Sequence, residues 1–141
     1  MPSTIVPDVL VDTGPLVALA DRRDRWHAPC VAWLKNFRGG LITTWPVLTE
    51  FSHLVPQPKA AIALYRWAVG GGLKIHALGQ PELGATADWM ERYADRPMDL
   101  ADASLVLTAM ALGVTQVWTL DRSDFEIYRL PNRKRFKLID M

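Results

Sequence analysis

The chain has 141 residues, of which 50% are hydrophobic and 22% charged, a composition typical of one globular domain. Sixteen Lys and Arg against fifteen Asp and Glu give a net charge of +1, which argues against both a strongly basic nucleic-acid binder and an acidic solvating protein. The single cysteine, Cys30, excludes an internal disulfide and a multi-cysteine zinc site, and so favours a reducing compartment such as the cytoplasm. We therefore expect a single domain over residues 1–141.

Two stretches bear on export and membrane insertion. The first basic residue is Arg22, so the N-terminal stretch lacks the positive region of a secretory signal. Residues 103–120 carry no charge, a length near the lower limit for a membrane span. Gly113 divides this window into a helix-like half and a β-branched half, which predicts a buried helix followed by a buried strand.

Apolar runs with little alternation predict strands in a sheet that is covered on both faces. These runs occupy residues 9–11, 41–44, 73–78, 115–120 and 136–139. Helices are predicted over residues 15–21, 27–38, 46–55, 58–69, 81–94 and 100–112. Strands that alternate with helices imply parallel crossover units and a three-layer α/β/α domain, in which ligands bind beyond the carboxyl ends of the strands.

Acidic residues occupy those positions. Asp12 follows the first predicted strand and Asp121 the fourth, while Glu50 lies one turn into the helix that starts at Pro46. Asp102 lies in the first turn of the 100–112 helix, after Asp99. Because helical side chains tilt toward the N-terminus, Asp102 can point at the strand ends. We expect Asp12, Glu50, Asp102 and Asp121 to converge there, within about one metal coordination shell.

Each acid also has a purely structural explanation. Asp12 can accept backbone donors of the following turn, and Glu50 can be a solvated helix residue. Asp99 is a good N-cap for the 100–112 helix, and Asp124 can cap the turn at Phe125. These explanations do not account for four acids at equivalent positions with no matching Lys or Arg. Such carboxylates would repel one another unless a cation bound between them.

An all-oxygen ligand set favours Mg²⁺ or Mn²⁺ over zinc. Such an ion lowers the pKa of bound water and neutralises charge that develops on phosphorus, and a second ion can stabilise the leaving oxygen. The predicted reaction is metal-assisted phosphodiester hydrolysis. The Glu50 and His53 spacing is that of di-iron bundles, but the second copy that such a site needs does not occur, and His27 and His76 fall on different elements.

Together these motifs resemble the PIN-domain nucleases, particularly the VapC toxins of bacterial toxin-antitoxin pairs. The motifs are Asp12-Thr13-Gly14-Pro15-Leu16, the helical Glu50, Asp102-Ala103 at the head of an apolar helix, and Thr119-Leu120-Asp121-Arg122-Ser123-Asp124-Phe125. The resemblance covers nearly the whole chain. It implies a five-stranded parallel sheet, a Mg²⁺- or Mn²⁺-dependent endoribonuclease, a homodimer and inhibition by a small VapB-type antitoxin.

The resemblance also assigns residues. It implies that Asp12, Glu50, Asp102 and Asp121 form an acidic quartet, with Asp99 and Asp124 as possible additional metal ligands and Thr13 and Thr119 as hydrogen-bonding supports. Asp99 and Asp102 remain alternatives for the third ligand. Family members often have Ser or Asn where this chain has Gly14, so a side-chain role at that position is absent.

Basic residues and tryptophans supply candidates for RNA contact beside the acids. The basic candidates are Arg22, Arg23, Arg25, Arg122, Arg133, Lys134 and Arg135. Trp26 and Trp45, near predicted loops, can stack on an unpaired base or fill a groove of a partner, whereas the other tryptophans are expected in the core.

Three alternatives to a nuclease remain. The first is a PIN fold that binds nucleic acid without cleaving it, although it would not need all four acids. The second is a haloacid-dehalogenase-like phosphatase with Asp12 as nucleophile, which would need an acid where Gly14 stands. The third is a phosphoacceptor receiver domain, whose acceptor Asp should follow the third strand, where this chain has Gly79, Gln80 and Pro81.

Overall fold

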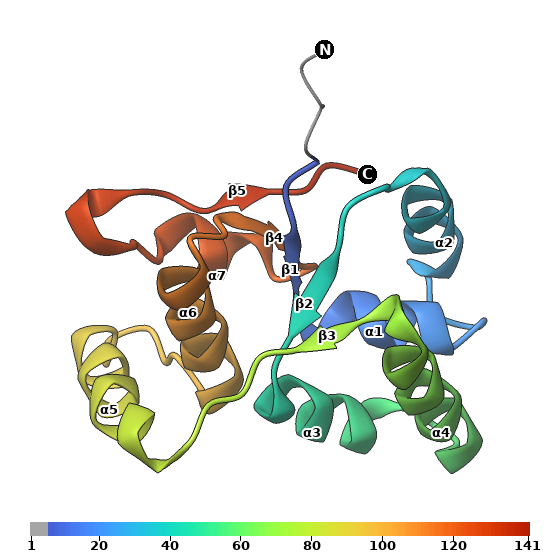
Figure 1. Cartoon of the computed structure of the whole chain (residues 1–141), viewed down its shortest axis with the longest axis horizontal. Helices are drawn as coiled ribbons and strands as arrows, with labels where there is room; N and C mark the ends of the chain where they lie inside the picture. The colour runs from blue at the N-terminus through green and yellow to red at the C-terminus, as the bar shows by residue number, and fades with distance from the viewer. Residues whose placement is uncertain (1–5) are drawn as a thin grey trace.

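The structure, a computed structural model, describes residues 6–141 and contains a parallel sheet of five strands in the order β3-β2-β1-β4-β5 (Figure 1). The strands are β1 (Val9–Val11), β2 (Leu41–Thr43), β3 (Lys74–Ile75), β4 (Gln116–Trp118) and β5 (Lys137–Leu138). β1 is central, with Leu10 in register with Ile42 on one side and Val117 on the other. The predicted five-stranded parallel sheet is therefore confirmed.

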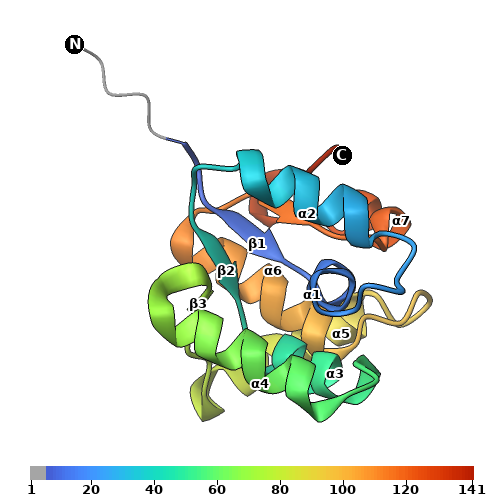
Figure 2. The same cartoon turned by 90° about the vertical axis from the view of Figure 1, so that its right-hand side faces the viewer.

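Helices cover both faces of the sheet. They are α1 (Thr13–Ala20), α2 (His27–Asn36), α3 (Trp45–Leu54), α4 (Pro58–Trp67), α5 (Leu83–Arg92), α6 (Leu100–Leu112) and α7 (Arg122–Ile127). Figure 2 shows α1, α2 and α4 on one face, with α5, α6 and α7 behind the sheet. α3 crosses the end of the molecule where β1 and β2 finish, and it packs against α1 and α6.

The uncharged window at 103–120 folds as predicted. α6 is buried along most of its length, as expected for a helix that is apolar around its whole circumference. It ends at Gly113, whose φ of 67° lies in the left-handed region that glycine adopts most readily. β4 follows at once, and its Val117 and Trp118 are fully buried. No helix in the described part of the chain is long and apolar enough to cross a membrane.

Several element boundaries differ from the predictions. The strand expected at 73–78 is only Lys74–Ile75, because β3 is an edge strand that pairs with β2 alone, and the chain then turns toward α5. The helix expected at 81–94 is split into a 3₁₀ turn, Gln80–Glu82, and α5. Helix α7 was not predicted, because six residues are too few to establish a helical period.

Candidate metal-binding active site

Asp12 lies at the carboxyl end of the central strand and begins α1 as its N-cap residue. Its side chain does not cap the helix and is only 3% exposed. Thr119, which follows β4, donates a hydrogen bond of 2.7 Å from Oγ1 to Asp12 Oδ2. Burial raises the pKa of Asp12 to about 6, the carboxylates of Asp121 and Glu50 add to the rise, and the Thr119 hydrogen bond opposes it. The position therefore suits a cation better than a structural cap.

Asp121 is attached to Asp12 through the same threonine. The backbone N–H of Asp121 donates to Thr119 Oγ1 at 2.9 Å, so one hydroxyl accepts from Asp121 and donates to Asp12. The pKa of the Asp121 carboxyl is raised by partial burial first, then by the charges of Asp124 and Asp99. These shared interactions fix the ends of β1 and β4 relative to each other.

Glu50 reaches the same region from the second turn of α3. That helix starts at Trp45 after Thr44, whose Oγ1 accepts a hydrogen bond from the N–H of Val47 at 3.5 Å. Burial raises the pKa of Glu50, and the charges of Asp99 and Asp121 raise it further. The hydroxyl of Thr13 lies near enough to favour the ionised Glu50 carboxylate, but it does not meet hydrogen-bond geometry.

Asp99 and Asp102 have different structural roles at the start of α6. Asp99 is the N-cap, and its Oδ1 accepts a hydrogen bond from the N–H of Asp102 at 2.8 Å, as its structural explanation predicted. Asp102 is partly buried and accepts a 3.0 Å hydrogen bond from the hydroxyl of Tyr128. Burial, followed by the charges of Asp99 and Asp12, raises the pKa of Asp102 to about 7. Asp102 therefore lies within reach of the charges of both Asp99 and Asp12.

Asp124 is the one predicted site acid that is paired with a base. Arg96 lies in the loop between α5 and α6. Its Nε is 2.9 Å from Asp124 Oδ1, and its Nη2 donates a hydrogen bond to Ser123 Oγ at 3.1 Å. Arg96 was missed in the sequence, because its partner is 28 positions away and no local pattern marks the pair. The pair ties the loop that leads to Asp99 onto α7.

The four quartet acids have no such compensation. Within residues 6–141 the ion pairs are Arg96 with Asp124 and Arg122 with Asp140, and neither involves Asp12, Glu50, Asp102 or Asp121. Arg122 also donates to the carbonyl of Ile139 at 2.7 Å, so it anchors the C-terminal segment.

The carboxylates do not form one closed coordination shell. Among residues 6–141 no three His, Cys, Asp or Glu side chains are arranged to hold one metal ion, so the expectation of a single shell is wrong for this structure. Uncompensated carboxylates repel one another and therefore stand apart, within reach of each other's charge. The donor set still fits a hard cation, since it is all oxygen, and the buried Thr13 Oγ1 has no hydrogen-bond partner among the described residues.

Of the predicted basic residues, Arg122 directly follows Asp121, whereas the others belong to segments farther along the chain from the acids. Arg133, Lys134 and Arg135 precede β5, whose Lys137 pairs with the first residue of β4, so they lie at the amino end of the sheet, opposite the acids (Figure 1). The expectation that these three lie beside the acids is wrong, because β5 runs parallel to β4 and the residues that precede it extend beyond the start of β4. The segment with Arg22, Arg23 and Arg25 follows the far end of α1.

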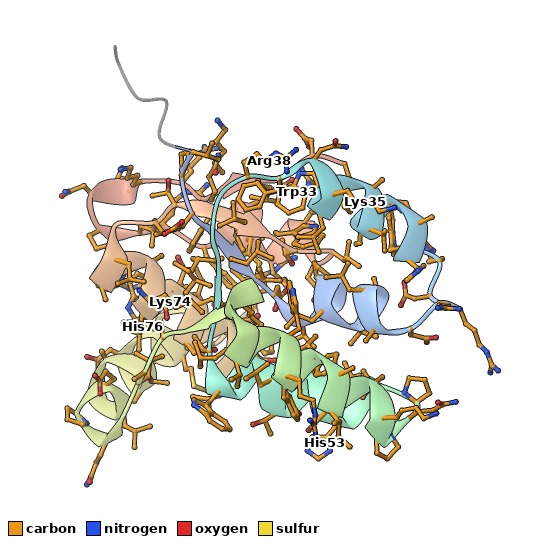
Figure 3. The ribbon with its side chains drawn as sticks, turned by 45° about the vertical axis from the view of Figure 1, so that its right-hand side comes forward. Trp33, Lys35, Arg38, His53, Lys74 and His76 are labelled. Carbon is orange, nitrogen blue, oxygen red and sulfur yellow. The ribbon has the colours of Figure 1, made fainter. Side chains whose placement is uncertain are left out.

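The histidines do not form a cluster either. Figure 3 shows His53 on the outer side of α3 and His76 just after β3, well separated from each other. His27 Nδ1 lies 2.7 Å from the carbonyl oxygen of Ala18, which ties α2 to α1. Within residues 6–141 the three histidines therefore lie on separate segments and have no common ligand position.

Gly14 has a packing reason. A Cβ at this position would lie 3.1 Å from Leu120 Cβ, tighter than most side-chain contacts in proteins. Leu120, which lies in the sequence between Thr119 and Asp121, therefore packs closely against the first turn of α1.

The geometry agrees with comparisons to known proteins. A model of the PIN domain family matches residues 9–131, and the chain therefore belongs to the PIN domain family. Ribonuclease VapC26 of Mycobacterium tuberculosis (strain ATCC 25618 / H37Rv) is 27% identical over 134 residues, which cover 93% of this chain and 99% of that protein.

Two solved structures are similar in fold. The first is VapC20 of Mycobacterium tuberculosis, described as a Sarcin-Ricin loop cleaving toxin, with a TM-score of 0.73, 19% identity and coverage of 82% of this chain and 93% of that one. The second is VapBC2 of Rickettsia felis bound to a DNA fragment from their promoter, with a TM-score of 0.60, 12% identity and coverage of 94% and 99%. At these identities the likeness establishes the PIN fold.

Proposed function

We propose that the chain is an endoribonuclease that hydrolyses RNA phosphodiester bonds with Mg²⁺ or Mn²⁺. The observation that carries this proposal is the set of four carboxylates at one end of the sheet, each with a raised pKa and none paired with Lys or Arg. Such a set is unfavourable in itself and becomes favourable when a divalent cation neutralises it. One domain, residues 1–141, would contain the whole site.

The acids would have different roles in binding the cation. Asp12, held by Thr119, and Asp102, held by Tyr128, would be the fixed cation ligands, with Glu50 and Asp121 closing the site. Asp99 and Asp124 are less suited, because the first caps α6 and the second pairs with Arg96. A bound divalent ion supplies a water of lowered pKa and neutralises charge on phosphorus. Thr13 Oγ1, which is buried and has no hydrogen-bond partner among residues 6–141, can donate to a ligand of the site.

Relatives indicate a biological setting. VapC26 is named a ribonuclease, VapC20 is described as a Sarcin-Ricin loop cleaving toxin, and VapBC2 was solved bound to a DNA fragment from their promoter. We infer that this chain is the cytoplasmic toxin of a toxin-antitoxin pair, acts as a homodimer and is inhibited by a small VapB-like antitoxin.

A groove for that antitoxin lies on the face opposite α6. It has a volume of 360 Å³ between α1, α2 and α4, and its apolar walls include Leu19, Leu34, Leu64 and Trp67. Arg22, Arg23 and Lys59 line an adjoining hollow. An amphipathic antitoxin segment with acidic residues would match this combination of apolar and basic surface.

The direct test is cleavage of total cellular RNA by the purified chain. We expect cleavage with Mg²⁺ or Mn²⁺, none with chelator, and a loss of at least 100-fold in Asp12→Asn or Asp121→Asn. Asp140→Asn, which removes an exposed carboxylate outside the quartet, is the matched control and should cleave normally. Cleavage that survives chelator or both substitutions would contradict the proposal and leave the non-catalytic binding module as the better explanation.

A further inference from the structure

A cleft adjoins the acidic site between α3, the Gln80–Glu82 turn, α5 and the start of α6. Its volume is 620 Å³, within the range of roughly 300–1,000 Å³ typical of small-ligand pockets. Glu50 and Asp99 belong both to its lining and to the acidic site. We propose that this cleft binds an unpaired nucleobase next to the scissile phosphate, stacked on Trp45. The proposal rests on the proposed nuclease function and specifies its substrate as RNA with an unpaired nucleotide at the cut.

Trp45 is a rigid, exposed platform. Its side chain is 69% exposed, although it is the first residue of a well-anchored helix. The preceding Thr44 is buried and shares a 2.6 Å hydrogen bond with Ser104 of α6, and the carbonyl of Trp45 accepts from Thr49 Oγ1 at 3.0 Å. The backbone is therefore fixed while the indole faces solvent. Exposed aromatic surface of this kind stacks on bases, and the anchored backbone leaves only the side-chain torsions of Trp45 to be ordered.

The other walls suit a flat, largely apolar ligand. Leu83 and Leu100 line the cleft and are also exposed, so Trp45 is one of three large apolar side chains around one opening. Clustered exposed apolar surface marks a binding site, whereas single residues do not. His53 adds an imidazole to the lining. The Thr49 and Thr86 hydroxyls donate to backbone carbonyls, so their oxygens can only accept hydrogen bonds from the polar edge of a base.

Charge distinguishes a base from a phosphate as the occupant. The lining contains the carboxyl residues Glu50, Glu82 and Asp99 but, within residues 6–141, no Lys or Arg. An anionic group would be repelled there, whereas an uncharged base would not. The phosphate would instead lie at the acids, where a cation neutralises them. Bases in a duplex are stacked and paired, so the cleft selects an unpaired nucleotide.

A binding test that needs no cleavage uses uncharged nucleosides. We expect adenosine, guanosine, cytidine or uridine to shift the indole N–H resonance of Trp45 in the full chain saturably, as measured by ¹⁵N NMR and assigned by its loss in Trp45→Phe. The buried Trp118 is the internal reference and should not move. The proposal would be overturned if no nucleoside shifted the resonance, or if inorganic phosphate shifted it equally. It would also be overturned if protein concentration alone shifted the resonance, which would show that a second copy covers the cleft.

A kinetic test measures kcat/KM on an unpaired oligoribonucleotide that the native chain cleaves. Loss of stacking should make Trp45→Ala roughly 5- to 150-fold slower, with Trp45→Phe close to native. Val69→Ala is the matched control, because Val69 is 91% exposed near Trp45 but does not line the cleft. Native rates in folded Trp45→Ala would refute the stacking role alone. Nucleoside binding without any RNA cleavage by the native chain would refute the nuclease function instead.

Discussion

At the scale of single residues, Thr119 connects two acids with one hydroxyl. It donates to Asp12 and accepts from the N–H of Asp121, both within 3 Å. A buried carboxylate that loses its donor keeps its desolvation cost, so the pKa of Asp12 would rise further above its value of about 6. Loss of a hydrogen-bonded neighbour of a metal ligand typically lowers metal affinity or activity by about 10- to 100-fold.

We therefore expect Thr119→Val to weaken metal activation. The Mg²⁺ concentration for half-maximal RNA cleavage should rise about 10- to 100-fold, and the free energy of unfolding should fall by about 1–3 kcal/mol. Thr119→Ser keeps the hydroxyl and should remain near native in both measurements. An unchanged metal dependence in Thr119→Val would show that Asp12 needs no support from this side chain.

At the scale of elements, the Arg96 pair joins two segments that carry acids. It connects the loop before α6 to α7, so that Asp99 and Asp102 stay close to Asp121. Both side chains are about one-third or more exposed, so the pair contributes little to global stability. Its effect should lie in the placement of the acids.

We expect Arg96→Ala and Asp124→Ala to lower kcat for RNA cleavage by similar factors, about 3- to 10-fold each, with unfolding free energies changed by less than about 1 kcal/mol. The double variant should be no worse than either single variant, because both remove one interaction. If Asp124 were instead a metal ligand, Asp124→Ala alone would raise the Mg²⁺ requirement. Measuring that requirement in both variants separates the two roles.

The elements that could be predicted from sequence are those with their own local signal. The apolar strands 9–11 and 115–120 and the helix 100–112 are marked by composition and by Gly113, and they determine where Asp12, Asp102 and Asp121 lie. Helix α7 and the Arg96 pair have no such signal, because the helix is only six residues long and the pair spans 28 positions. The place of Arg133 likewise depends on strand order, which composition does not specify.

At the scale of the whole molecule, the net charge of +1 hides an uneven distribution, because acidic and basic side chains gather in different parts of the fold. The acids gather at the carboxyl end of the sheet, whereas Arg133, Lys134 and Arg135 lie at its amino end. The acidic end carries an electrostatic cost that burial and mutual repulsion both increase. That cost should appear in the stability of the folded protein as a dependence on pH and on divalent metal.

The sign follows from the pKa values. Asp12 and Asp102 have pKa values of about 6 and about 7 in the folded chain, against 3.8 for an unperturbed Asp. The folded state therefore holds these protons more tightly than the unfolded state. The resulting stabilisation is complete below the unfolded pKa and is lost as the pH rises through 6 and 7. For Asp12 alone the loss is about 3 kcal/mol.

With chelator present, we therefore expect the free energy of unfolding, measured by urea denaturation, to fall between pH 5 and pH 7.5. Asp12→Asn mimics the protonated side chain and should remove much of the fall, whereas Asp140→Asn, at an exposed ion pair, should not. Adding Mg²⁺ should restore stability at pH 7.5 more than at pH 5, because protons compete with the cation for the same oxygens. If the free energy of unfolding rose with pH in chelator, or did not change on addition of Mg²⁺ at pH 7.5, these carboxylates would be compensated by groups other than a cation.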